Sequence, residues 1–239
     1  MDPADAFAPD GVVAVVGAGG KKSTLYALAA GLDRSAVTAT VRIPPFEGHV
    51  ERHVVTETPV DVLRSNETWP LGLVPGRDGD RDRYLGYDVE TVDAMAGATD
   101  VPILVKADGA RGRWLKAPAD DEPQLAGSTT LVVPVASVRA VGEPLDDDRV
   151  HRPEQVAAIT ALESGDEIRS RDVAAVLTHP EGGLRGVPET STVRPLVNMV
   201  DDDLEATARQ IAAEVVDHDR IDAVVLGRMD LRQVVDVVT

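Results

Sequence analysis

The chain has 239 residues, of which 24 are Lys or Arg and 41 are Asp or Glu, so its formal net charge is −17. This charge argues against nucleic acid as a partner, and the absence of cysteine excludes disulfides, iron–sulfur clusters and thiolate zinc sites. No apolar run approaches the roughly 20 residues of a membrane span, and no basic and then apolar leader opens the chain. We therefore expect a soluble, cytoplasmic protein without a membrane partner.

The acidic composition is typical of proteins from salt-rich cells. Acidic triplets stand at 146–148 and 201–203, and only four of the basic residues are lysine. At molar salt the Debye length falls to about 3 Å, so a dense negative surface is tolerated. Because lysine is this rare, two adjacent lysines in a glycine-rich segment indicate a binding site.

The first predicted elements are a strand, a glycine loop and a helix. An apolar, β-branched run over 12–16 precedes the loop, and a helix-forming stretch over 25–30 follows it. This order is typical of a phosphate-binding loop, in which backbone N–H groups and a helix N-terminus face the anion. We expect a nucleotide to be bound by Gly17, Ala18, Gly19, Gly20, Lys21, Lys22, Ser23 and Thr24.

Two alignments with the usual pattern G-x-x-x-x-G-K-[ST] are open. If Lys22 is the phosphate lysine, Ser23 follows it correctly, but Lys21 stands where glycine is expected. If Lys21 is the phosphate lysine, Gly20 precedes it correctly, but Lys22 occupies the hydroxyl position. We favour Lys22 with Ser23, because the hydroxyl then leads directly into the helix. The plain alternative is a glycine turn that caps a helix in some other α/β protein.

Further along the chain, strands and helices alternate as in a wound α/β sheet. The apolar runs predict strands over 36–41, 101–105, 129–135, 193–200 and 221–227. The remaining patterns predict helices over 89–97, 153–162, 170–178 and 202–216, and a short one that starts near Pro59 within 56–65. We therefore predict a P-loop NTPase-like α/β fold with a mostly parallel sheet and helices on both faces. Residues 1–239 would form one domain, with room for a small inserted subdomain within 44–97.

A second segment that points to chemistry follows the strand over 101–105. Asp108 and Gly109 resemble the metal-linked motif of P-loop proteins, in which a carboxylate holds Mg²⁺ directly or through water. Arg111, Arg113 and Lys116 then crowd one short loop, where they could receive an anionic substrate or a phosphate. The alternative is a surface turn whose arginines pair with neighbouring acids.

The predicted winding brings this segment to the glycine loop, because the carboxyl ends of parallel strands meet at one edge of the sheet. Ser23 and Asp108 would then share a Mg²⁺ ion, since hard oxygen ligands suit this metal. Arg111, Arg113 and Lys116 would line the outer cleft, with His151 on its rim. His151 could act as a base or a substrate partner, or it could cap the helix that Pro153 begins.

At these segments the chain resembles the YqeC-type proteins, known as accessory proteins for selenium-dependent molybdenum hydroxylases. Three features depart from the family pattern: Lys22 is an extra lysine, residues 38–42 replace a run of threonines, and Lys106 stands where Glu is usual. The motifs that carry the resemblance are GAGGK at 17–21, TAT at 38–40, ADGARG at 107–112, LKAPA at 115–119, EP at 122–123, GEPL at 142–145, VHRPE at 150–154 and, more weakly, LVNMVD at 196–201.

The acidic composition indicates a haloarchaeal source, and the resemblance implies an accessory or maturation protein that binds ATP or GTP with Mg²⁺. Its partners would be a nucleotide and a molybdenum-cofactor species or a molybdenum hydroxylase. Asn198 and Asp201 would read the base in an Asn-x-x-Asp pattern, which leans toward guanine without settling the base. Catalytic roles would fall to Asp108, Arg111, Lys116 and His151. Three functions stay open: an NTP hydrolase that serves maturation, a catalytically silent nucleotide-binding scaffold, and a small-molecule kinase.

Overall fold

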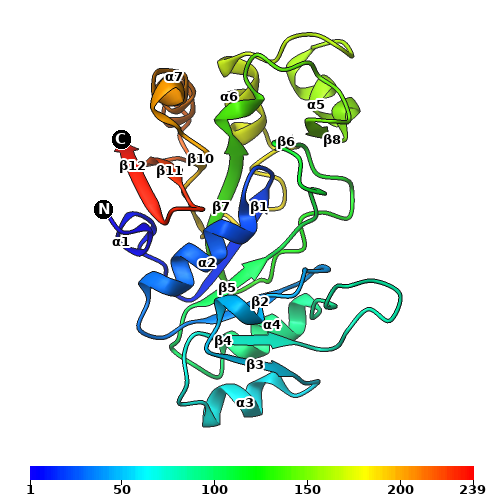
Figure 1. Ribbon diagram of the computed structural model, residues 1–239, viewed down its shortest axis with the longest axis vertical. Coiled ribbons are helices and arrows are strands. Elements are labelled where there is room, and N and C mark those ends of the chain that lie inside the picture. Colours follow the sequence, from blue (N-terminus) through cyan, green and yellow to red (C-terminus); the bar gives the residue numbers. More distant parts are fainter.

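One long sheet runs through the molecule and carries helices on both faces (Figure 1). The computed structural model describes residues 1–239. The strands of the sheet are β1 (Val12–Gly17), β2 (Ala36–Ala39), β3 (Arg52–Val55), β4 (Leu71–Val74), β5 (Ile103–Lys106), β7 (Thr129–Ser137), β9 (Thr192–Val193), β10 (Leu196–Asn198), β11 (Val224–Arg228) and β12 (Gln233–Val238). A separate two-stranded parallel sheet pairs β6 (Leu115–Lys116) with β8 (Val150–His151).

The strand order is β12-β11-β10-β7-β1-β5-β2-β4-β3, with β9 paired to β7. Every pair is parallel except β11 and β12. The helices are α1 (Pro3–Phe7), α2 (Lys21–Gly31), α3 (Pro59–Ser65), α4 (Val89–Ala96), α5 (Pro153–Thr160), α6 (Ser170–Thr178) and α7 (Glu205–Val216), with 3₁₀ turns η1 (Glu47–His49), η2 (Val138–Ala140) and η3 (Asp202–Leu204). The predicted α/β fold with a mostly parallel sheet is confirmed.

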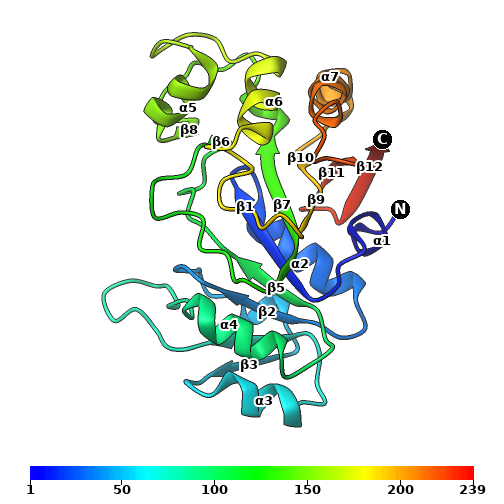
Figure 2. The same ribbon diagram turned by 180° about the vertical axis from the view of Figure 1, so that it is seen from behind.

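The period-2 alternation of the strands decides which helix covers which face. Val13 and Val15 of β1 pack with Leu28 of α2, whereas Val12 packs with Met95 of α4 on the other side. Figure 1 accordingly shows α2 in front of the sheet, and the opposite view in Figure 2 shows α4 in front of the sheet. Beyond β7, the face shared with α4 is covered by α6 and α7.

Several predicted elements match the structure closely. The helix predicted within 56–65 is α3 and begins at Pro59, and the helix predicted over 170–178 is α6 with the same bounds. The strand predicted over 193–200 is instead split into β9 and β10, with Pro195, which has no N–H to donate to a neighbouring strand, between them. The predicted helix over 202–216 opens as the 3₁₀ turn η3 before α7 begins.

The structure also contains elements that the sequence patterns did not indicate, namely α1, β3, β4, β12 and the small β6–β8 sheet. The segment 44–97 supplies β3 and β4, and β4 pairs with β2 so that the main sheet continues into this segment. No helix is long and apolar enough to cross a membrane.

Candidate functional site

The glycine loop sits on the carboxyl ends of β7 and β10. Gly17, Gly19 and Gly20 have φ angles of 88°, 83° and 126°, which L residues with side chains rarely adopt. A Cβ atom at Gly17 would overlap the Val135 carbonyl, and one at Gly20 would overlap the side-chain amide of Asn198. The glycines therefore let the loop lie directly against its neighbours, in addition to leaving its outer side open.

The backbone amides of the loop divide into two groups. Gly17 N–H donates to the Asp108 carboxylate at 2.8 Å, Ala18 N–H to Val135 O at 2.8 Å, and Gly19 N–H to Arg113 O at 2.9 Å. The next four amides, from Gly20 to Ser23, make no hydrogen bond within the protein. They open α2, where the helix leaves its first N–H groups unsatisfied and its dipole is positive. The loop thus presents four adjacent donors to an anion.

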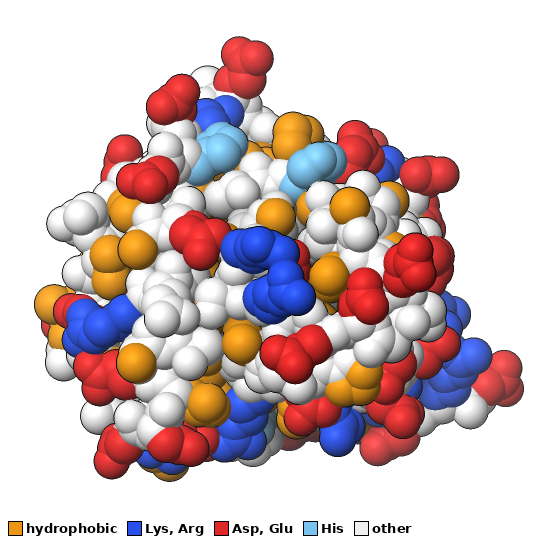
Figure 3. Space-filling view, turned by 90° about the horizontal axis from the view of Figure 1, so that it is seen from above, with side chains coloured by type: hydrophobic (Ala, Val, Ile, Leu, Met, Phe, Trp, Pro, Cys, Tyr) orange, Lys and Arg blue, Asp and Glu red, His pale blue; other side chains and the backbone are white.

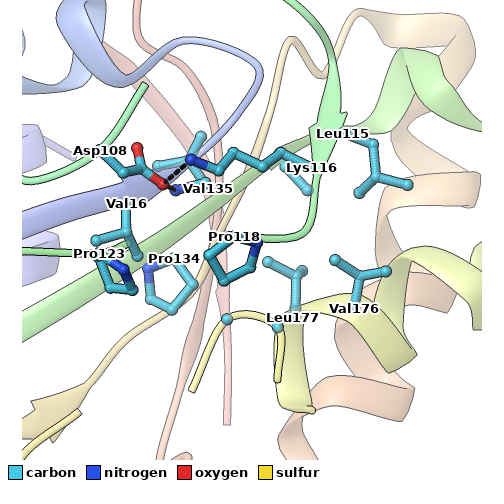
Figure 4. A pocket seen from close by; sticks show the side chains of 14 residues that line it. Val16, Asp108, Leu115, Lys116, Pro118, Pro123, Pro134, Val135, Val176 and Leu177 are labelled. Carbon is cyan, nitrogen blue, oxygen red and sulfur yellow. Dashed lines mark hydrogen bonds and ion pairs between the residues drawn. The ribbon is translucent and has the colours of Figure 1, made fainter. Parts of the chain in front are cut away.

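Asp108 lies behind the loop in a buried ion-pair network. Its carboxylate is 2.8 Å from Lys21 Nζ and 2.9 Å from Lys116 Nζ, and its residue is 1% exposed. Figure 4 shows the Asp108 and Lys116 side chains pointing toward one another above a group of prolines and other apolar side chains, around a small cavity of about 20 Å³. Burial by itself would raise the pKa of Asp108, but the two ammonium groups outweigh it and hold the pKa below its usual value.

Lys116 points into this network and not into the outer cleft, which corrects the expectation for this residue. Its ammonium is 2.6 Å from the Glu122 carboxylate, and Glu122 is also 2.7 Å from Arg152. Two carboxylates, Asp108 and Glu122, draw the lysine inward, so that its side chain is fully buried. Burial works to raise the pKa of Glu122, but the hydrogen bond and the charge of Lys116 lower it to about 2.

His151 stands beside Lys116 in the small β6–β8 sheet and does not line the cleft. Burial first, and then the positive charges of Arg152 and Lys116, lower its pKa to about 4. The imidazole is therefore neutral at neutral pH. Pairing of β8 with β6 brings it into the layer that holds Lys116, next to the cleft, where the charge of the cleft residue Arg111 also acts on it.

The predicted magnesium pair does not fit a metal ion in this arrangement. Ser23 lines the cleft, but both oxygens of Asp108 face lysine ammonium groups, and one also accepts the Gly17 amide. No three His, Asp or Glu side chains gather anywhere in a geometry that could hold a metal. Thr24 is buried, and its hydroxyl donates to Gly20 O at 3.0 Å, so it too is turned away from a ligand.

In front of the loop lies an open cleft of about 860 Å³. Eight of the nine charged residues that line it are basic, although the chain as a whole carries a net charge of −17. On the face in Figure 3, by contrast, acidic side chains are spread widely and basic ones form small groups among them. The charged lining residues are Lys21, Lys22, Arg42, Arg81, Arg83, Lys106, Arg111 and Arg113, with Asp82 as the single acid.

Most of these cleft cations have no acidic partner. Lys22, Arg81, Arg83, Arg111 and Arg113 lie within 4 Å of no carboxylate, although they share one cleft. Arginines outside the cleft are of both kinds: those at 185 and 209 each contact two carboxylates, and Arg64 contacts none. Arg111 has a φ of 47°, so a strained backbone holds it at the loop tip. The alternative of a surface turn whose arginines pair with neighbouring acids does not describe the loop that carries Arg111 and Arg113. An unpaired group of cations beside four free amides is suited to an anionic ligand.

Lys106 is a buried cation of the cleft whose pKa is also lowered. Its ammonium donates to Arg42 O at 2.9 Å and to Asp108 O at 2.7 Å, and its residue is only 7% exposed. Burial, together with the positive charge of Lys21, lowers its pKa to about 7. An anion in the cleft would stabilise the protonated form and raise this pKa.

The two residues expected to read a base lie elsewhere. Asn198 is buried, and its amide donates to Gly19 O at 2.8 Å and accepts from Met229 N–H at 3.0 Å. It braces the glycine loop from β10 and does not line the cleft. Asp201 pairs with Arg139 and Arg228 at the surface. The Asn-x-x-Asp spacing therefore does not place the two side chains together at a base.

Sequence reasoning missed the cleft wall formed by Arg42, Arg81 and Arg83. Arg81 and Arg83 lie in a turn-rich segment without apolar periodicity, and Arg42 follows β2, so no spacing links them to the glycine loop. In the sequence Arg81 and Arg83 alternate with aspartates, so nothing marks them as unpaired. Lys106 was noted only as a departure from the resembled family.

Two comparisons with known proteins agree. The family model described as YqeC protein matches residues 13–154, which run from β1 into the start of α5 and include the glycine loop and the Asp108 network. An Escherichia coli (strain K12) protein named "Uncharacterized protein YqeC" is 31% identical over 184 residues, which cover 74% of this chain and 72% of that protein. No solved structure matches the chain. On these two matches, the chain belongs to the YqeC family.

Proposed function

We propose that this protein binds a nucleoside triphosphate, ATP or GTP, in the cleft in front of the glycine loop. The observation that carries the proposal is the cleft lining, in which eight of nine charged residues are basic in a chain of net charge −17. The four free amides from Gly20 to Ser23 would take one phosphate group, because a helix N-terminus favours negative charge. Lys22, Arg111 and Arg113 would take the others.

Of the two adjacent lysines, Lys22 is the better candidate for the phosphate. Lys21 is buried, its charge is balanced by Asp108, and its ammonium also donates to Gly17 O. Lys22 is exposed, lines the cleft and has no carboxylate within 4 Å. A phosphate would therefore gain a new ion pair from Lys22 without breaking a buried one.

Isothermal titration calorimetry with ATP, GTP, AMP and GMP in molar KCl tests the proposal. We expect the triphosphates to bind more tightly than the monophosphates, and Lys22→Met to weaken triphosphate binding by about tenfold, as the loss of one charge-assisted contact implies. Arg64→Ala is the matched control, because Arg64 is exposed on α3, outside the cleft, and forms no ion pair.

If a folded Lys21→Met loses affinity while Lys22→Met binds normally, the phosphate lysine is Lys21 and the nucleotide site stands. If neither variant changes the affinity, the nucleotide site is contradicted.

The role in maturing a molybdenum hydroxylase or its cofactor is part of the same proposal, and the motif resemblance alone supports it. Disruption of the gene should lower molybdenum hydroxylase activity in the cell and leave other oxidoreductases unchanged. Phosphate release from ATP or GTP with Mg²⁺ in molar KCl separates an NTP hydrolase from a silent scaffold. Acceptor-stimulated release would instead favour a small-molecule kinase.

A further inference from the structure

The cleft has a second basic wall that comes from a different part of the chain than the glycine loop. Arg81 and Arg83 lie in the segment between β4 and α4, and Arg42 follows β2. None of these residues belongs to the glycine loop or to the loop that carries Arg111. The wall therefore adds cations beyond those that the proposed triphosphate site uses.

The wall is a built part of the fold. Tyr84, which follows Arg83, is 1% exposed and packs against Phe46 and His53. Its backbone exchanges two hydrogen bonds with Ile43, of 3.0 and 2.7 Å. Gly86 approaches the backbone between residues 40 and 41 so closely that any Cβ would overlap it. The arginines are thus carried on a segment that is anchored on both sides.

The charges of this wall are unbalanced. Arg81 and Arg83 have no carboxylate within 4 Å, although the chain contains 41 acidic residues, and Asp82 between them pairs with neither. Arg42 has one partner, Asp78, at 2.6 Å. The charge of Arg81 also helps to lower the pKa of Asp78, so this one acid serves two of the three guanidinium groups. A further anion would offset the positive charge that remains. Guanidinium forks bind phosphate oxygens in a bidentate manner, which makes phosphate the fitting class of anion.

We propose that Arg42, Arg81 and Arg83 form a second phosphate-binding subsite, so that the cleft holds phosphate groups at two places at once. The inference rests on the proposed function for the first place, the glycine loop. The second phosphate belongs either to a separate phosphorylated ligand or to a distant part of the same ligand. Both sources share the chemistry of a phosphate held by arginines, and competition with a nucleotide distinguishes them.

Inorganic pyrophosphate is the probe, titrated by calorimetry into the full chain in molar KCl with EDTA. The wild type is expected to bind two pyrophosphate ions per chain. The double variant Arg81→Ser with Arg83→Ser should bind one, at the glycine loop, and Lys22→Met should weaken only that one, by about tenfold. Arg64→Ser, on the exposed side of α3, is the control and should bind two. All four substituted side chains are exposed, so circular dichroism should show folded variants.

Each outcome separates the two proposals. If the chain binds one pyrophosphate, and Lys22→Met weakens its binding while the Arg81→Ser/Arg83→Ser variant does not, the second subsite is overturned and the first is kept. If the chain binds one pyrophosphate, and only the Arg81→Ser/Arg83→Ser variant loses it, the second subsite is kept and the proposed function is overturned. Two ions unaffected by either change overturn both assignments, as does the absence of binding.

Saturation with ATP or GTP then identifies the source of the second phosphate. If the nucleotide displaces one pyrophosphate and the other still binds, the second subsite serves a separate phosphorylated ligand. If the nucleotide displaces both, the two places belong to one ligand, and the arginine variant should then weaken nucleotide binding as well.

Discussion

Behind the glycine loop every charge is paired, whereas in front of it most cations have no partner. The buried side joins Lys21, Asp108, Lys116, Glu122 and Arg152 in an unbroken chain of ion pairs. On the open side, Lys22, Arg81, Arg83, Arg111 and Arg113 line the cleft with no carboxylate within 4 Å. The two regions share one loop and use the same kinds of side chain.

Burial explains the difference. A charge removed from water is tolerated only when a counter-charge and hydrogen bonds replace the water, so each buried lysine contacts a carboxylate or backbone carbonyls. At the solvated cleft, water stabilises the unpaired guanidinium groups until an anion arrives. The buried region therefore serves stability and loop position, and the cleft serves binding. Four measurements test this division between the buried region and the cleft.

The largest effect is expected at Asp108. Asp108→Asn leaves two buried ammonium groups facing each other without their shared counter-charge, and it should lower the free energy of unfolding by about 3–5 kcal/mol. Denaturant unfolding in molar KCl measures the change. Asp82→Asn, which removes an exposed carboxylate from the cleft, should shift stability by less than about 0.5 kcal/mol and is the control.

A companion variant keeps the Asp108 prediction specific. Adding Lys116→Met to Asp108→Asn removes one of the two orphaned charges and should recover part of the lost stability. Equal stability of Asp108→Asn and the wild type would mean that the buried chain of ion pairs is not what holds the loop.

The second effect concerns Asn198, which braces the loop. Asn198→Ala leaves Gly19 O and Met229 N–H without their partners and should cost about 1–3 kcal/mol of stability. Because the side chain holds the loop and reads no base, the affinities for ATP and GTP should fall by the same factor. A selective loss of GTP binding would restore the base-reading interpretation. Asp201→Asn is the control and should alter neither affinity.

The third effect is acid lability. His151 has a folded pKa of about 4 against an ordinary value of 6.5, so the unfolded chain binds more protons between these values and stability falls as pH drops from 6.5 to 4. Glu122 has a folded pKa of about 2 against 4.5, so its contribution is complete above pH 4.5 and is lost as pH falls toward 2.

The two contributions separate in single variants. Unfolding free energies measured from pH 7 to 2 should flatten between 6.5 and 4 in His151→Gln, and between 4.5 and 2 in Glu122→Gln. If either variant keeps the wild-type slope in its own window, the assigned residue is not the group that titrates there.

The smallest expected effect is a proton uptake at Lys106, which lies between the buried region and the cleft. Its pKa of about 7 means that the amine is mostly neutral at pH 8, and an anion in the cleft should raise the pKa. Pyrophosphate binding at pH 8 should therefore take up a fraction of a proton, which calorimetry in buffers of different ionisation enthalpy detects. Lys106→Met should bind without this uptake. Uptake that persists in the variant would assign the proton to another group.

The local elements and the glycine loop could be predicted from the sequence alone. Apolar periodicity placed α3, α4 and α6 within a residue or two, because a helix with one buried face imprints its 3.6-residue period on the chain. The strand, glycines and lysines from Val12 to Ser23 predicted the loop, and motif order placed the chain near its family. Asp108 was expected beside the loop because parallel strands end at one edge of the sheet, and its contact with Gly17 lies there.

Which charges are paired could not be predicted from the sequence, because pairing depends on the folded arrangement. Lys116 and Arg111 are both basic residues in the same short segment of the sequence. Lys116 is buried between Asp108 and Glu122, whereas Arg111 faces the cleft. Asn198 is a brace because β10 is folded against the glycine loop. Arg81 is part of a cleft wall because the loop after β4 lines the same cleft as the glycine loop. A charged side chain is assigned its role by its burial and its counter-charge, and both are properties of contacts between segments far apart in the chain.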